Sequence, residues 1–99
     1  MIIDCHTRLW SDPRQLGETT ARTLVDRPPA WAEHSGDAAA LGRAMACVDA
    51  SLVLGHRAEL VGAHVPNELI ADFVARDPRY RLGIAGIDPL AESAMQDLD

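Results

Sequence analysis

Residues 77–89 have the sequence Asp-Pro-Arg-Tyr-Arg-Leu-Gly-Ile-Ala-Gly-Ile-Asp-Pro, and this stretch decides the fold class. Its first pair, Asp77 and Pro78, ends a helix, because the residue before a proline avoids the helical region and proline cannot donate a backbone hydrogen bond. Residues 80–87 combine aliphatic and small side chains over a length typical of a strand. A second Asp-Pro pair at 88–89 suits a helix start. The stretch therefore predicts helix, strand and helix in succession.

The same alternation continues toward the N-terminus. Residues 67–76 carry apolar side chains at helical spacing, and Asn67 is the expected cap of that helix. Residues 47–54 end in the apolar run Leu-Val-Leu before Gly55. Such a run is typical of a strand buried on both faces.

Two further elements complete the pattern. Residues 36–46 are rich in alanine and predict a helix capped by Ser35 or Asp37, and the β-branched residues 1–5 predict a first strand. The order β-α-β-α-β-α is the pattern of a parallel sheet with right-handed crossovers. We expect the strand order 1-2-3, three helices on one face, and a last helix that is cut short at Asp99.

A long polar connection separates the first strand from the first helix. Residues 9–35 contain three prolines and two tryptophans, Trp10 and Trp31. Asp12 as cap, Pro13 as first residue and Gly17 as stop predict a single helical turn within it. Connections of this length are usually lids or binding loops, although an unstructured insertion is the alternative. The two large aromatic side chains favour an ordered loop.

The composition excludes several classes of function. The chain has 99 residues, a formal net charge of -6, and 47% hydrophobic and 24% charged residues, which is an ordinary globular composition. The negative charge disfavours binding to nucleic acid or to an anionic membrane surface. All nine basic residues are arginines, so no lysine is present for Schiff-base or P-loop chemistry. The acidic start of the chain lacks the pattern of a secretory signal, and we expect a cytoplasmic protein.

The two cysteines are too far apart in sequence for a zinc knuckle or a redox pair. Cys5 and Cys47 are separated by more than forty residues. Free cysteine is among the residue types that are most often buried. We therefore expect two buried thiols without a chemical role.

Several segments resemble one enzyme family. The opening Ile3-Asp4-Cys5-His6-Thr7-Arg8-Leu9-Trp10 resembles the first-strand motif D-x-H-x-H of the amidohydrolase family, specifically its amidohydrolase-2 branch. The segments Val53-Leu54-Gly55 and Val65-Pro66-Asn67-Glu68 and the whole of residues 77–89 are also similar to that branch. They occur in order across nearly the whole chain.

The resemblance implies a (β/α)8 barrel with a zinc or manganese ion at the carboxyl ends of its strands. A complete barrel needs about 250 residues. Residues 1–99 would then be the N-terminal part of the barrel, an incomplete domain with strands one to three. The later histidine ligands and the catalytic aspartate of the family would not belong to this segment.

His6 is the first candidate ligand, because it matches the first histidine of the motif and lies toward the carboxyl end of strand one. A neutral imidazole is a good ligand for zinc or manganese. The alternative is a histidine that merely fills space at the carboxyl ends of the strands, which form the mouth of the sheet. Period-2 alternation puts Asp4 on the same side as His6 and Arg8, so that Asp4 would orient the His6 ring or pair with Arg8.

Arg8 departs from the motif, since the family carries its second histidine at this position. A guanidinium has no free lone pair and cannot bind a metal. At about 4 Å and an effective dielectric constant of ~20, it would also repel a divalent ion by about 8 kcal/mol. Three interpretations stay open: the metal is lost, His6 and distant ligands hold it, or Arg8 binds a substrate carboxylate. A fourth interpretation is that the chain is an inactive copy in which this position has drifted.

Further candidates follow the later strands. His56 and Arg57 follow strand two and Asp88 follows strand three, so all three are secondary site candidates. His56 and Arg57 would bind substrate with Arg8, and the alternative is that each is an ordinary loop residue. The leading hypothesis is a fragment of an amidohydrolase-type enzyme that hydrolyses C–N or C–O bonds of a small carbonyl or carboxylated substrate, or decarboxylates it. The isolated chain would be inactive and would self-associate through its open sheet edges. The alternative is a non-enzymatic remnant or a small βα interaction module.

Overall fold

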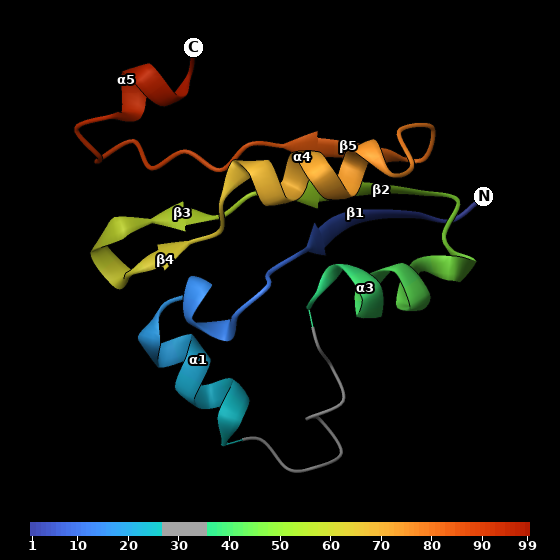
Figure 1. Cartoon of the computed structure of the whole chain (residues 1–99), viewed down its shortest axis with the longest axis horizontal. Coiled ribbons are helices and arrows are strands. Elements are labelled where there is room, and N and C mark those ends of the chain that lie inside the picture. Colours follow the sequence, from blue (N-terminus) through green and yellow to red (C-terminus); the bar gives the residue numbers. More distant parts are fainter. Residues whose placement is uncertain (27–35) are drawn as a thin grey trace.

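The computed structural model describes residues 1–26 and 36–99. Three parallel strands form one sheet in the order β1 (Ile3–Arg8), β2 (Ala50–Leu54) and β5 (Arg81–Ile84), as Figure 1 shows. Helix α3 (Ala38–Ala44) precedes β2, and helix α4 (Asn67–Ala75) precedes β5. The parallel α/β alternation and the strand order that the sequence predicted are confirmed.

The remaining elements lie between these, except α5, which follows β5. A second, antiparallel pair of strands, β3 and β4, follows β2. The bounds are η1 Pro13–Gln15, α1 Glu18–Val25, η2 Met45–Cys47, β3 Arg57–Ala58, η3 Glu59–Val61, β4 Ala63–His64 and α5 Ala94–Asp97. The sequence of residues 55–66 predicts a loop, so this hairpin differs from the expectation.

The core lies on one face of the sheet. Its buried side chains are Leu9, Val53, Val65, Ile70 and Phe73, and Leu41 of α3 packs against them. Because α3 and α4 both contribute to the cluster around Val53 of β2, both helices lie on the same face. A Cβ at Gly83 would meet Val74 and Ile70 of α4 at 3.2 and 3.3 Å, so the absent side chain lets α4 approach β5 closely.

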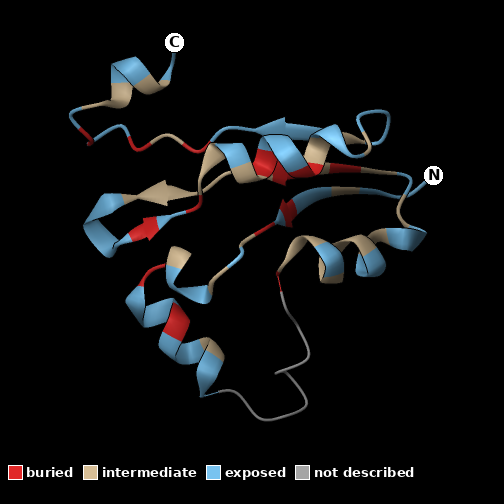
Figure 2. Ribbon diagram, in the orientation of Figure 1, coloured by how far each residue is buried: buried red, intermediate tan, exposed pale blue. Residues whose placement is uncertain are grey.

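The opposite face of the sheet is apolar and exposed. Leu82 is 62% and Ile84 44% exposed, and they pair in register with Leu52 and Leu54. Along β2 the buried residues Ser51 and Val53 alternate with half-buried ones, and Figure 2 shows the neighbouring strand β5 as largely exposed. The prediction that this strand is buried on both faces is therefore wrong. Among residues 1–26 and 36–99, no element covers the second face.

The connection after β1 is ordered where the structure describes it. The predicted turn is η1, where Asp12 forms a reciprocal capping box with Gln15. Helix α1 follows it and was not predicted, although Glu18 and Arg22 form an ion pair one turn apart. The predicted anchor Trp31 and the predicted cap Ser35 lie outside the described residues.

Trp10 and Gly36 join the two ends of this connection. The Trp10 backbone N–H donates to the Gly36 carbonyl over 3.0 Å, and a Cβ at Gly36 would lie 2.2 Å from the indole ring. Only glycine allows this contact. One residue later, the Asp37 carboxylate accepts the Ala40 N–H over 2.8 Å and caps α3, as predicted.

Asn67 does not cap α4, contrary to the prediction. Pro66 occupies the cap position without a side-chain hydrogen bond. The Asn67 amide instead binds the backbone of Gly86, because its Oδ1 accepts the Gly86 N–H over 2.8 Å and its Nδ2 donates to the Gly86 carbonyl over 3.2 Å. The side chain thus fixes the segment that leaves β5.

The last predicted helix is reduced to one turn. Residues 88–93 form turns, and only α5 is helical. Its Asp97 pairs with Arg57, which ties α5 to β3 rather than to the sheet. The prediction of three helices on one face therefore holds for two of them.

The exposure of the two cysteines differs from the expectation. Cys5 and Cys47 are both free and exposed, so the prediction of buried thiols is wrong. Within the described part of the chain, every helix is too short or too polar to span a membrane.

Candidate functional site

The candidate residues gather at the carboxyl ends of the parallel strands. Arg8 at the end of β1 pairs in register with Leu54 of β2, which pairs with Ile84 of β5. His56 follows Leu54 by two residues at the same edge. Sequence reasoning therefore placed His6, Arg8 and His56 at the correct end of the sheet.

A bulge in β1 separates Asp4 from this group. Asp4 pairs with Ser51 and Thr7 pairs with Val53, so three residues of β1 span the distance of two in β2. The Asp4 Oδ1 accepts the backbone N–H of His6 over 2.8 Å, which stabilises the bulge. The simple alternation that put Asp4 on one side with His6 and Arg8 is wrong. The extra residue in the bulge puts the Asp4 side chain on the sheet face opposite to that of Arg8. Asp4 thus holds the His6 backbone and leaves the ring to another partner.

That partner is Arg8. Its Nε donates to the His6 Nε2 over 3.1 Å. A guanidinium can only donate, so the Nε2 of His6 accepts and the ring carries its proton on Nδ1. Both side chains are exposed. Among the described residues, no ion pair links Arg8 to Asp4, the other partner that the sequence suggested.

His56 is half-buried beside them. Burial lowers the pKa of its imidazole below the ordinary value of 6.5, and the positive charge of Arg8 lowers it further. The backbone of His56 packs closely against Gly86. A Cβ at Gly86 would lie only 2.6 Å from the backbone nitrogen of His56. The mouth of the sheet thus holds one guanidinium and two imidazoles, of which His56 favours its neutral form.

Arg57 is engaged elsewhere. Its guanidinium forms ion pairs with Asp97 and with Glu59, the latter over 2.7 Å, and donates to the Ser93 hydroxyl over 3.1 Å. Its side chain is only 17% exposed. A substrate carboxylate would have to displace one of these partners, so the arrangement favours a role in holding α5 against the hairpin.

Asp88 is also a structural residue in this arrangement. It is buried, and its carboxylate accepts the backbone N–H groups of Glu59 over 2.7 Å and Leu90 over 2.9 Å. These two donors lower the pKa of Asp88 below its ordinary value. The aspartate after strand three therefore joins the hairpin to the C-terminal segment.

The donor set does not fit the zinc or manganese ion that the family resemblance implies. The Nε2 lone pair of His6 is occupied by Arg8, and a guanidinium beside a divalent ion is repulsive. Within the residues that the structure describes, no three histidine, cysteine, aspartate or glutamate side chains are grouped so that they could hold a metal. The chemistry of this mouth suits an anion better than a cation.

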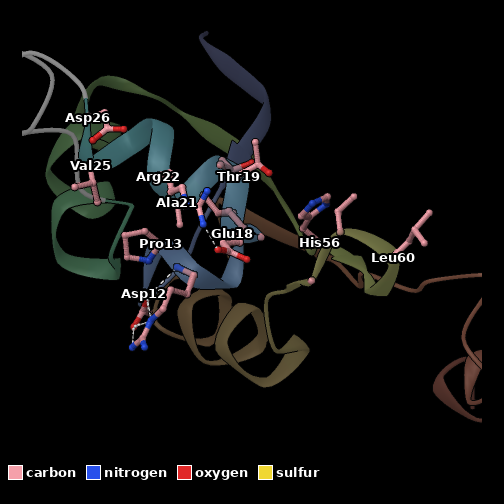
Figure 3. A pocket seen from close by; sticks show the side chains of 16 residues that line it. Asp12, Pro13, Glu18, Thr19, Ala21, Arg22, Val25, Asp26, His56 and Leu60 are labelled. Atoms are coloured by element: carbon pink, nitrogen blue, oxygen red, sulfur yellow. Dashed lines mark hydrogen bonds and ion pairs between the residues drawn. The ribbon is translucent and has the colours of Figure 1, made fainter.

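A groove adjoins the mouth at His56. It has a volume of about 1290 Å³ and lies between α1 on one side and the hairpin turn on the other, with η1 at its base. Figure 3 shows His56 and Leu60 on the hairpin side and Glu18, Ala21 and Arg22 on the helix side. Sequence reasoning missed this groove because it missed α1 and the hairpin, and the Glu18–Arg22 spacing was the one signal of α1.

Comparisons with protein families, with curated proteins and with solved structures gave no match to this chain.

Proposed function

We propose that this chain is the N-terminal part of an amidohydrolase-type (β/α)8 barrel enzyme in which Arg8 binds a substrate carboxylate. The reaction would be hydrolysis of a C–N or C–O bond, or decarboxylation. Three parallel strands with helices on one face and exposed apolar side chains such as Leu82 on the other support a barrel segment. The inner side chains of a barrel are bulky and apolar in the same way.

The hydrogen bond from Arg8 to His6 carries the proposal. It uses the Nε of the guanidinium, and within residues 1–26 and 36–99 neither terminal nitrogen makes a hydrogen bond, so both can bind a ligand. Two terminal N–H groups match the two oxygens of a carboxylate in a bidentate pair, which is stronger than a single neutral hydrogen bond. His6 therefore acts as a positioning residue that fixes the plane of the guanidinium.

His56 supplies a second group to the same mouth. A neutral imidazole accepts a proton at its free nitrogen, and the lowered pKa keeps His56 neutral at pH 7. We propose that further βα units of the complete protein supply the other reacting groups. The 99-residue chain would then bind a carboxylate without turning it over.

Equilibrium dialysis of the chain against labelled benzoate tests the carboxylate site. Arg8→Gln removes the guanidinium and should weaken benzoate binding by at least ~10-fold, which corresponds to about 1.4 kcal/mol of binding free energy. Arg43→Gln is the matched control, because Arg43 is an exposed arginine in the last turn of α3 and lies outside the groove and the strand ends. Equal affinity for benzoate in the Arg8→Gln variant and the unmodified chain would refute the proposal.

A non-enzymatic βα interaction module is the second candidate. The exposed apolar face around Leu82 and Ile84 favours it, because such a face needs a partner. Benzoate binding that depends on Arg8 would support the enzyme, whereas association with another chain and no carboxylate binding would support the module.

A further inference from the structure

The groove beside His56 is larger than a small substrate needs. Its volume of about 1290 Å³ exceeds the range of roughly 300 to 1,000 Å³ over which pockets bind drug-sized ligands. A substrate of one ring bound at Arg8 would not occupy this groove. The size of the groove therefore bears on the substrate class, an inference that rests on the proposed function.

The groove walls expose apolar side chains. Val25 of α1 is 77% exposed, Leu60 of the hairpin turn 90% and Val61 62%, and all three line the groove. The wall between them includes the small side chain of Ala21. Exposed aliphatic side chains from two elements that face one hollow favour an apolar ligand over a polar one.

The charges on the walls are arranged in pairs. Arg14 pairs with Asp12 over 2.6 Å, and Arg22 pairs with Glu18 on the helix side. These pairs offer an anion little net attraction along the length of the groove. The Asp26 carboxylate would repel an anion and lies near Val25, away from His56 in Figure 3.

One end of the groove is different. His56 lines it, and the register of β1 with β2 places Arg8 at the same edge of the sheet. Arg8 keeps two terminal nitrogens for a ligand, as described above. A negative head group is thus favoured at this end, and an uncharged body is favoured along the rest.

We propose that the groove holds the acyl chain of an amphipathic carboxylate whose head group binds Arg8, a fatty acid of about ten carbons being the simplest example. The body of the ligand runs from His56 past Ala21 toward Val25. The substrate of the complete enzyme is then an acyl compound rather than a small ring acid.

Equilibrium dialysis against decanoate, butyrate and decanol separates the head group from the chain. Each fully buried methylene contributes about fourfold in affinity, so six half-buried methylenes should make decanoate bind about 60-fold more tightly than butyrate. Decanol lacks the charge and should bind at least ~10-fold more weakly than decanoate.

Three variants test the location. Val25→Asp in the groove and Arg8→Gln at its end should each weaken decanoate binding by at least ~10-fold. Leu90→Asp is the control, because Leu90 is an exposed aliphatic residue outside the groove and outside the sheet. Decanoate binding that falls in Leu90→Asp and not in Val25→Asp would overturn the inference.

The remaining outcomes distinguish this inference from the proposed function. Equal affinities for butyrate and decanoate, both lost in Arg8→Gln, would refute the groove and leave the carboxylate site standing. Binding of neither acid would refute both. Decanoate binding with the 60-fold preference and sensitivity to Val25→Asp supports the inference.

Discussion

The Arg8 Nε–H donates to the His6 Nε2 over 3.1 Å, so two side chains at the end of one strand hold each other. His6 lies within the β-bulge between Asp4 and Thr7. The contact between Arg8 and His6 makes a strand end that resembles a metal motif less suited to a cation, because the imidazole lone pair is used and the added charge is positive.

Metal content tests this relationship directly. Arg8→His removes the positive charge and adds a second imidazole two residues from His6, so the variant should retain more zinc than the unmodified chain. Elemental analysis after dialysis against zinc measures the difference. Arg14→Gln controls for the loss of one positive charge. Stoichiometric, tightly held zinc on His6 of the unmodified chain would show that Arg8 does not block the site.

The His56 imidazole should titrate below pH 6.5. Because burial and Arg8 lower its pKa in the folded chain, the unfolded chain binds more protons just below pH 6.5. The free energy of unfolding should therefore fall as the pH falls from 6.5 to the folded pKa, and stay level for this group below both values. NMR of the ring protons measures the pKa, and Arg8→Gln should raise it. A pKa at or above 6.5 in the unmodified chain would contradict the structure.

Gly36 should not tolerate a side chain. In Gly36→Ala the added Cβ would lie 2.2 Å from the Trp10 ring. Overpacking of this kind should lower the free energy of unfolding by about 1 to 3 kcal/mol. Gly42→Ala is the matched control, because Gly42 lies within α3 with nothing near its missing Cβ. This control should gain about 0.5 to 1 kcal/mol from its higher helix propensity. Urea unfolding of both variants measures the contrast, and equal effects would refute it.

Asn67 should stabilise the fold through Gly86 and not through helix capping. Asn67→Ala leaves the Gly86 N–H and carbonyl without these partners and should cost about 1 to 3 kcal/mol. Asn67→Asp keeps the oxygen that accepts the Gly86 N–H and should recover part of the loss. Urea unfolding measures both variants. An alanine variant as stable as the unmodified chain would mean that the contact contributes nothing.

The open sheet face should make the 99-residue chain self-associate. Leu82 and Ile84 expose apolar surface beside the unpaired edge of β5, so light scattering should show species larger than the monomer. Leu82→Asp should shift the chain toward the monomer, whereas Leu90→Asp, at an exposed position outside the sheet, should not. A monodisperse monomer with a sharp urea transition in the unmodified chain would contradict this.

Local patterns predicted the elements that depend on local interactions. Helix α4 ends at Ala75, shortly before the predicted stop at Asp77 and Pro78, Asp37 caps α3, and Asp12 caps η1, because each effect acts within a few residues. The alternation of strands and helices likewise predicted a parallel sheet and placed the mouth residues at its carboxyl edge.

The sequence by itself determined the α/β alternation and the edge at which Arg8, His6 and His56 lie, since helical spacing, strand length and chain order are properties of neighbouring residues. Only the tertiary structure decided which groups these residues contact. The bulge that redirects Asp4, the Asn67 contact with Gly86, and the pairing of Arg57 with Asp97 all join parts of the chain whose separation or register no local pattern encodes. Long-range contacts of this kind form only when packing brings the segments together, whereas the contact that decides the chemistry of the mouth joins Arg8 to His6, two residues away.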